Sequence, residues 1–153
     1  MLIGFFIEPD YRLKKIVINY KKQIKENLGD QIYLNHPVHS TLFTINIKKS
    51  FSVNKIFETI KFIKNFKKIK IKVSKVNFFY NDPITKENTC FLGVKRNTLL
   101  INFQRDIMKL INKNYGSEII RKNNFKGLMK KNFDQFGYPF VYKNWKPHFT
   151  ISS

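Results

Sequence analysis

One short sequence frame occurs twice in this chain and constrains its fold more than any other feature. Residues 37–42 and residues 145–151 both contain a His-x-Thr tripeptide followed by an aliphatic residue, in apolar surroundings that indicate a β-strand. Successive side chains of a strand point to opposite faces, so a histidine and a threonine two positions apart share one face. The two copies therefore predict two strands that each present an imidazole and a hydroxyl on the same side.

The residues around the two frames strengthen this prediction. The first copy places His39 and Thr41 on one face, and the second places His148 and Thr150 on one face. Their apolar neighbours, which can enter a core, are Val38, Leu42, Phe149 and Ile151. A single histidine in an apolar strand is commonly a hydrogen-bonded core residue. Two matched copies, which hold two of the chain's three histidines, favour a chemical role.

Two imidazoles and two hydroxyls that converge on one point suit a phosphodiester. A neutral histidine can act as general base, a protonated histidine as general acid, and hydroxyls can donate to phosphoryl oxygens. Because the unperturbed pKa of histidine is about 6.5, both forms exist near neutral pH. The sequence therefore predicts His39 and His148 as an acid–base pair, in either order, and Thr41 and Thr150 as the groups that hold the phosphate.

The paired frames resemble the motifs of the 2H phosphoesterase superfamily, which includes 2′-5′ RNA ligase-like proteins and cyclic nucleotide phosphodiesterases. The resemblance spans most of the chain, from the expected first strand at residues 2–7 to the end. It implies an α+β, bilobed, pseudo-twofold fold, with a central cleft between antiparallel-sheet lobes that are flanked by helices. Each lobe would give one His-x-Thr strand to the cleft.

The same resemblance implies a reaction. It is the metal-independent hydrolysis of a 2′,3′-cyclic phosphate or a 2′-5′ linkage in a nucleotide or RNA end, with ligation as the reverse reaction and no cofactor. Residues 136–141, which read FGYPFV, also resemble a bacterial branch associated with phosphonate-metabolism loci. A small cyclic phosphate or a phosphonate-metabolism intermediate is therefore an alternative substrate.

Four further residues near the second frame are candidates for substrate contact. Tyr138, Tyr142 and Trp145 are candidates for stacking a base at the cleft mouth, and Lys146 for steering phosphate. The alternative is that the aromatic side chains pack the loop beneath the second frame and that the lysine is solvated. Members of the superfamily usually continue beyond the second motif. Either residues 81–135 complete the second lobe here, or part of that lobe is absent.

The composition indicates one folded domain over residues 1–153. Hydrophobic residues make up 42% of the chain and aromatic residues 16%, which argues against disorder. No apolar run approaches the roughly 18 residues of a membrane span, and residues 1–7 indicate a strand rather than a signal peptide. One cysteine, Cys90, excludes an intrachain disulfide, and the three histidines form no recognisable metal-ligand set. We expect a cytoplasmic monomer.

The charge leaves a second class of function open. Lysine and arginine number 29 against 10 acidic residues, which gives a net charge of +19 and predicts an anionic partner. Arginine, the better residue for bidentate phosphate recognition, occurs only four times. The abundance of Lys, Ile, Asn and Phe is also typical of an AT-rich genome. A basic RNA-binding module without significant turnover is the alternative to the enzyme, although a pure binder has no need of two matched His-x-Thr strands.

Periodicity predicts the remaining elements. Helices are expected at residues 11–28, between Asp10 and Gly29, and at about 52–66, 98–115 and 117–135. Lys21 is expected on the wet face of the first helix, and Ser50 or Ser52 is expected to cap the second, whose inner stripe includes Ile60 and Ile63. Strands are expected at 2–7, which we expect to be buried, 38–47, 68–73 and 89–94, with a hairpin across residues 81–88. The alternating lysines of residues 68–73 indicate either a guarded sheet edge or a track for an RNA backbone.

Overall fold

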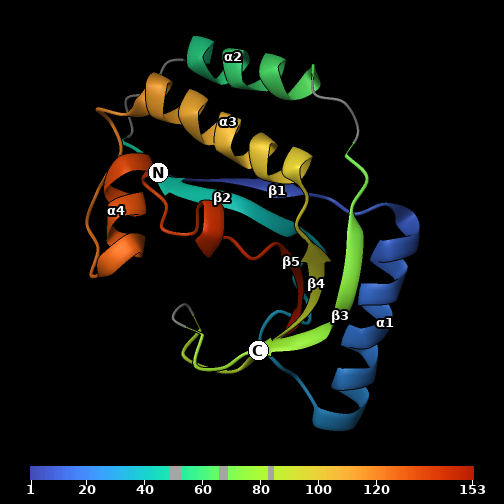
Figure 1. The fold of residues 1–153 in the computed structure, drawn as a ribbon. Helices are drawn as coiled ribbons and strands as arrows, with labels where there is room; N and C mark the ends of the chain where they lie inside the picture. The colour runs from blue at the N-terminus through green and yellow to red at the C-terminus, as the bar shows by residue number, and fades with distance from the viewer. Residues whose placement is uncertain (49–52, 66–68, 83–84) are drawn as a thin grey trace. The chain divides into compact units, whose positions relative to one another are not determined.

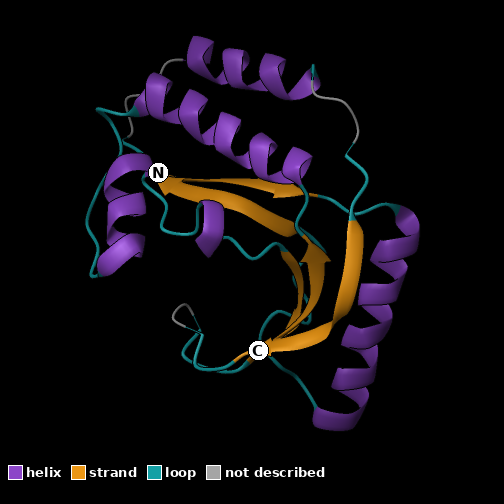
Figure 2. Ribbon diagram, in the orientation of Figure 1, coloured by secondary structure: helices purple, strands orange, loops and turns teal. Residues whose placement is uncertain are grey.

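The chain has an α+β architecture, as the sequence predicts. The computed structural model describes residues 1–48, 53–65, 69–82 and 85–153. Within these residues the chain forms two small antiparallel sheets and four α-helices (Figures 1 and 2). It divides into two compact units, which are described separately below. Unit one comprises residues 1–5, 42–70 and 96–146, and unit two comprises residues 6–41, 71–95 and 147–153.

Unit one contains most of the two-stranded sheet and three helices. The sheet pairs β1 (Leu2–Ile7) with β2 (Ser40–Asn46). Ile47 N–H donates to the Met1 carbonyl at 2.9 Å and Phe5 stacks on Phe43, so the strands run antiparallel. Beside the sheet, α2 (Val53–Lys64) contacts α3 (Thr98–Tyr115), and α3 contacts α4 (Gly127–Phe136) (Figure 1). The expectation that residues 2–7 are buried was wrong, since Leu2 is 66% exposed.

The predicted bounds of α3 are confirmed, and its apolar stripe forms the centre of unit one. Asn97 caps the helix, because its side-chain oxygen accepts from Leu100 N–H at 2.9 Å. The stripe residues Leu100, Phe103, Ile107 and Ile111 are buried. The sequence did not predict the burial of Gln104, whose amide donates to the carbonyls of Leu42 and Phe140. A buried amide is tolerated there because both donors have partners.

Unit two is built on a three-stranded antiparallel sheet with α1 (Tyr11–Leu28) packed against it (Figure 1). Its order is β3 (Lys72–Phe79), β4 (Thr89–Lys95) and β5 (His148–Ser152), and β3 and β4 form the predicted hairpin. Every residue of β4 except the last is buried, whereas the edge strand β3 is largely exposed. The second His-x-Thr strand is therefore paired with residues 89–95, within the range expected to complete its lobe.

The caps of α1 follow the sequence prediction. Asp10 accepts from Leu13 N–H at 2.9 Å, and Gly29, at a φ of 76°, donates its N–H to the Lys25 carbonyl. The expected wet face of α1 was wrong in one respect, because Lys21 is only 6% exposed. Lys21 lies one turn after buried Val17, and its long stem crosses the apolar face to reach backbone carbonyls.

Two other element predictions need correction. The strand expected at residues 68–73 begins at Lys72, and residues 69–71 are not in a strand. The helix expected at residues 117–135 begins only at Gly127, whose φ of 56° marks its start rather than an interruption. Asn123 accepts from Phe125 N–H in the preceding loop, a local turn that competes with helix formation.

The second helix is confirmed over residues 53–64, but its inner face differs from the predicted stripe. Ile60 is 40% exposed, whereas Thr59 is 2% exposed and donates to the Lys55 carbonyl. The expected caps, Ser50 and Ser52, lie outside the described residues. No helix in the described ranges combines the length and the apolar character needed to cross a membrane.

Candidate functional site

All four residues of the two His-x-Thr frames belong to unit two. His39 and Thr41 lie in its first segment, and His148 and Thr150 lie in its last. The family resemblance implies one motif strand from each lobe, so this division differs from that expectation. The physical reason is that β2 begins only at Ser40, and His39 is held by the loop that follows α1. The motif strands β2 and β5 belong to different sheets.

The first frame has the predicted alternation. Val38, Ser40 and Leu42 are buried, at 6%, 2% and 3% exposed, and His39 and Thr41 between them are half-buried. The expected strand over residues 38–47 is shorter than predicted, and His39 precedes its first residue. The alternation of buried and half-buried residues continues to His39, one residue before the strand begins. The His39 imidazole and the Thr41 hydroxyl therefore still lie on the same side.

The second frame has the same alternation within β5. Phe149 and Ile151 are 0% and 1% exposed, and His148 and Thr150 are half-buried. On the neighbouring strand, Gly93 lies opposite His148 and Phe91 lies opposite Thr150. Directly opposite residues share a face of the sheet. The imidazole of His148 and the hydroxyl of Thr150 therefore lie on the same face of the sheet as the Phe91 side chain, and Gly93 adds no side chain to that face.

Hydrogen bonding determines the tautomer of His39. Its Nδ1 lies 2.8 Å from the Pro37 carbonyl oxygen. A carbonyl oxygen can only accept, so Nδ1 carries the proton in this contact and the neutral ring keeps its lone pair on Nε2. The ring also makes an edge contact with Phe6, at a centroid distance of 4.5 Å. The Pro37 carbonyl and the Phe6 ring thus hold the imidazole of His39, and in its neutral form the accepting nitrogen is Nε2.

The surroundings of His39 favour its neutral form. Burial, the largest cause, lowers the pKa of His39 from 6.5, and the positive charges of Lys21 and His36 lower it further. The hydrogen bond to Pro37 and the charge of Glu8 act in the opposite direction. Because the net direction is downward, the imidazole is ready to accept a proton at neutral pH.

An aromatic cluster surrounds His148. Its ring lies 4.9 Å from the Phe79 ring and 5.1 Å from the Phe91 ring, at interplanar angles of 81° and 60°. These two phenyl rings stack on each other at 4.0 Å. Edge-to-face arrangements of this kind are favourable for aromatic rings. The sequence analysis did not identify Phe79 or Phe91, since only the strand register reveals that they meet His148.

A serine occupies the space that Gly93 leaves open. A methyl group added to Gly93 would overlap Ser74 Oγ. Gly93 lies opposite His148, so the Ser74 hydroxyl lies on the His148 side of the sheet. The irregularity in β3 between Val73 and Val76 turns Ser74 toward this side. The only sequence signal for this arrangement is a glycine inside an otherwise apolar strand.

Two connections join the loop that carries His39 to the rest of unit two. Ile32 and Ser153 exchange backbone hydrogen bonds of 3.1 and 3.0 Å, which attach this loop to the residue that follows β5. Lys21 Nζ donates to the carbonyls of Tyr33 and His36 at 2.6 and 2.7 Å, which attaches it to α1. The loop before the first frame and the strand of the second frame are therefore parts of one hydrogen-bonded assembly.

The other candidate contact residues belong to unit one. Tyr138 and Trp145 are 9% and 2% exposed, and burial raises the pKa of Tyr138. Tyr138 packs against Phe43 and Phe140, so its surroundings fit the packing alternative. The remaining two candidates are exposed, namely Tyr142 and Lys146.

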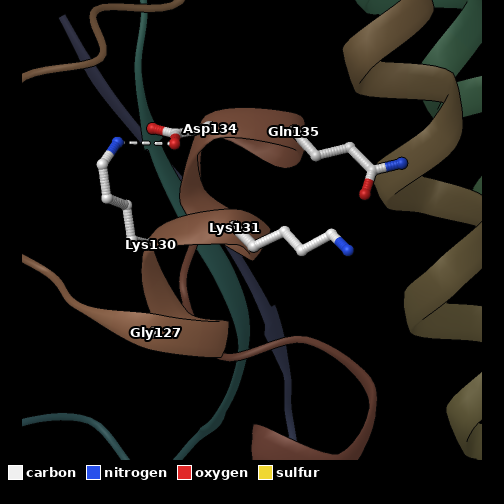
Figure 3. A pocket seen from close by; sticks show the side chains of 5 residues that line it. All are labelled: Gly127, Lys130, Lys131, Asp134 and Gln135. Carbon is white, nitrogen blue, oxygen red and sulfur yellow. Dashed lines mark hydrogen bonds and ion pairs between the residues drawn. The ribbon is translucent and has the colours of Figure 1, made fainter.

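A shallow cavity of about 510 Å³ lies along α4 in unit one (Figure 3). Lys130 and Asp134 form an ion pair of 2.6 Å at its wall, with Lys131 and Gln135 on the neighbouring turns. None of the His-x-Thr residues lines it. The carboxylate in this lining, that of Asp134, is paired with Lys130.

Comparisons with family models, with curated proteins and with solved structures find no match. In the described ranges, no three side chains of His, Cys, Asp and Glu gather in a way that could hold a metal ion. Function is therefore inferred from the His-x-Thr residues and their surroundings.

Proposed function

We propose that this protein is a phosphodiesterase of the 2H type that works without a metal ion. Its substrate is a 2′,3′-cyclic phosphate or a 2′-5′ linkage in a nucleotide or an RNA end, and the bilobed, pseudo-twofold fold of that superfamily is part of the proposal. The observation that carries it is the matched alternation of the two frames. In both, the histidine and threonine are half-buried and the residue between them is at most 2% exposed.

The proposal assigns the general base to His39. Its neutral ring carries the proton on Nδ1 and a lone pair on Nε2, and burial lowers its pKa. His148 is then the general acid. Nε2 of His39 accepts a proton from water while the water oxygen bonds to phosphorus. The bond from phosphorus to one ester oxygen breaks, and that oxygen takes the proton of His148.

This step leaves a phosphomonoester and a free ribose hydroxyl when the substrate is cyclic. His39 ends protonated and His148 neutral, and proton exchange with solvent restores the pair. The hydroxyls of Thr41 and Thr150 donate to the non-bridging phosphoryl oxygens, where negative charge increases in the transition state. These roles need only side chains that the two frames supply.

A basic RNA-binding module remains the second candidate, and one observation favours it. Phe78 of the edge strand and Tyr80, in the turn that follows it, stack at 6.2 Å and are 47% and 75% exposed. Lys72 and Lys75 are exposed on the same strand. Exposed aromatic rings near cations can stack bases without sequence preference. Such a surface would bind RNA whether or not the His-x-Thr residues catalyse its hydrolysis.

A substrate panel in excess EDTA tests the proposal. The panel contains 2′,3′-cyclic nucleotides, 2′-5′ and 3′-5′ dinucleotides, short RNAs with cyclic phosphate ends, and a small cyclic phosphate without a base. We expect turnover of the cyclic or 2′-5′ members that EDTA does not reduce. Binding of RNA without turnover of any member would replace the enzyme with the binding module, and activity that returns only with a divalent ion would reject the mechanism.

A further inference from the structure

A second cavity lies in unit two, and none of the four His-x-Thr residues lines it. It measures about 380 Å³ and lies between one side of α1 and the loop at residues 34–38. Lys14, Lys21, Lys22 and Lys25 of α1 line it. Lys14, Lys21 and Lys25 lie seven and four positions apart, so their side chains form one stripe along the helix, and Lys22 lies beside this stripe. The volume is at the lower end of the range for small-molecule pockets.

The positive charge of this cavity is only partly neutralised within the described residues. Lys22 pairs with Glu26 at 3.6 Å and Lys25 pairs with Asp30 at 2.8 Å, in both cases with exposed side chains. Solvent-exposed ion pairs of this kind contribute little free energy. In the described part of the chain, no ion pair involves Lys14 or Lys21.

Lys21 is the unusual member of the group. Its side chain is 6% exposed, and its ammonium donates to the two neutral carbonyls of Tyr33 and His36. A buried cation without a counter-charge is costly, and burial lowers the pKa of Lys21 accordingly. Two hydrogen bonds use two of its three N–H groups. The third N–H group belongs to an ammonium that lines the cavity.

The floor of the cavity is apolar beside this charge. Leu34 and Val38 are buried, and Ile18 is 49% exposed. A bare inorganic anion would contact only the charged side. A phosphate attached to a nucleoside would meet the ammonium groups with its oxygens and the apolar side chains with its sugar or base.

We propose that this cavity binds the phosphate of a nucleotide unit, as a second anion site distinct from the His-x-Thr residues. The nucleotide is either a free mononucleotide or one unit of an RNA chain. Both sources present the same phosphate–nucleoside chemistry. The site does not depend on catalysis by His39 or His148, so it stands or falls independently of the proposed reaction.

The test compares two neighbouring lysines in the full-length chain. Lys14→Gln removes a charge from the cavity, and Lys15→Gln removes the same charge from an exposed position that does not line it. Binding of AMP, of inorganic phosphate and of an unmodified hexauridylate is measured by titration calorimetry. The chemical shifts of residues 14–38 are followed by NMR. None of these probes has a cyclic phosphate or a 2′-5′ bond, so turnover does not enter the result.

We expect saturable binding of AMP, of hexauridylate or of both, with shifts confined to residues 14–38. Affinity should fall at least threefold in Lys14→Gln and remain within twofold in Lys15→Gln. If AMP binds, the site takes a free nucleotide; if only hexauridylate binds, the site takes a unit of a chain. For hexauridylate, Lys14→Gln should also reduce the salt slope by about 0.7, the release of one counterion.

Three results would overturn the proposal. Equal losses of affinity in the two variants would mean that the overall positive charge of the protein attracts the probe and that the cavity does not bind it. Inorganic phosphate bound as tightly as AMP would show that the apolar floor contributes nothing. Absence of binding by all three probes, with shifts at residues 14–38 unchanged, would leave no nucleotide site there.

Discussion

At the scale of single residues, the two histidines differ in their surroundings. His39 donates from Nδ1 to a backbone carbonyl, whereas His148 lies among phenyl rings. The sequence predicted both residues but could not separate their roles, because both frames read His-x-Thr. The distinction comes from Pro37 and the loop conformation, which local sequence does not encode.

The lowered pKa of His39 predicts the shape of the pH profile. Since burial favours the neutral form, the acidic limb of kcat/KM should have its midpoint below 6.5. Between this midpoint and pH 6.5 the unfolded chain binds more protons, so the contribution of His39 to stability falls as pH falls through that window. NMR titration of the His39 ring should give the same midpoint. A midpoint above 6.5 in both measurements would contradict the assignment of His39 as base.

The threonine hydroxyls should act through hydrogen bonds to phosphate. Thr41→Val and Thr150→Val keep the branched shape and remove the donor, so each should lower kcat/KM by about 10- to 100-fold, the value of a hydrogen bond to a charged group. Thr41→Ser and Thr150→Ser should stay within a few-fold of the wild type. Thr44→Val, in the same strand as Thr41, is the matched control. Equal activity of all the valine variants would remove the threonines from the site.

Lys21 should matter for stability as well as for charge. Lys21→Met leaves the carbonyls of Tyr33 and His36 without their donor, and we expect a loss of about 2 kcal/mol in the free energy of unfolding. Lys22→Met changes the neighbouring residue, whose side chain is 72% exposed, and should change stability by less than about 0.5 kcal/mol. Urea denaturation measures both. Equal effects would mean that the buried ammonium does not hold the loop.

At the scale of elements, the sequence predicted those segments whose local signals agree with one another. The helix at residues 11–28 has a capping Asp10, a one-sided apolar stripe and Gly29, and its predicted bounds are those of α1. Prediction failed where tertiary contacts decide. The burial of Lys21 depends on carbonyls twelve and fifteen residues away. The late start of α4 has a local cause instead, the turn in which Asn123 accepts from Phe125 N–H.

The β-strand register makes its own prediction at Gly93. Gly93→Ala should cost about 1–2 kcal/mol of stability, because its methyl group would meet Ser74 Oγ. Ser74→Ala removes that oxygen, so Gly93→Ala should be neutral or stabilising in this background, where alanine also restricts the unfolded chain. A double-mutant cycle by thermal or urea denaturation measures the coupling. Additive effects of the two substitutions would show that Ser74 does not lie over Gly93.

At the scale of the whole molecule, the gap of 109 positions between His39 and His148 suggested one motif in each of two duplicated lobes. The division of the chain instead assigns both histidines to unit two, although their strands belong to different sheets. Both histidines are in unit two because residues 147–153, at the end of the sequence, pair with β4 and with Ile32 of the same unit. Sequence spacing alone cannot reveal which distant segments pair.

The net charge of +19 acts on the molecule as a whole. It should draw anionic substrates toward the protein and make substrate capture sensitive to salt. Lysines on all four α-helices and on β3 and β4 do not specify a site, because a diffuse field attracts any polyanion. The lysines of α1 that share a cavity give the defined position that we propose for a phosphate group.

The most direct test of the central claim removes each histidine in turn. On the best substrate of the panel, with EDTA present, His39→Gly and His148→Gly should each lower kcat by roughly 10²–10⁴-fold. The double variant should be little worse than the poorer single variant, because groups that act as a unit are not additive. Added imidazole should restore part of the activity of a single variant that remains folded. Wild-type rates in both single variants would contradict the paired-histidine mechanism, and the basic RNA-binding module would take its place.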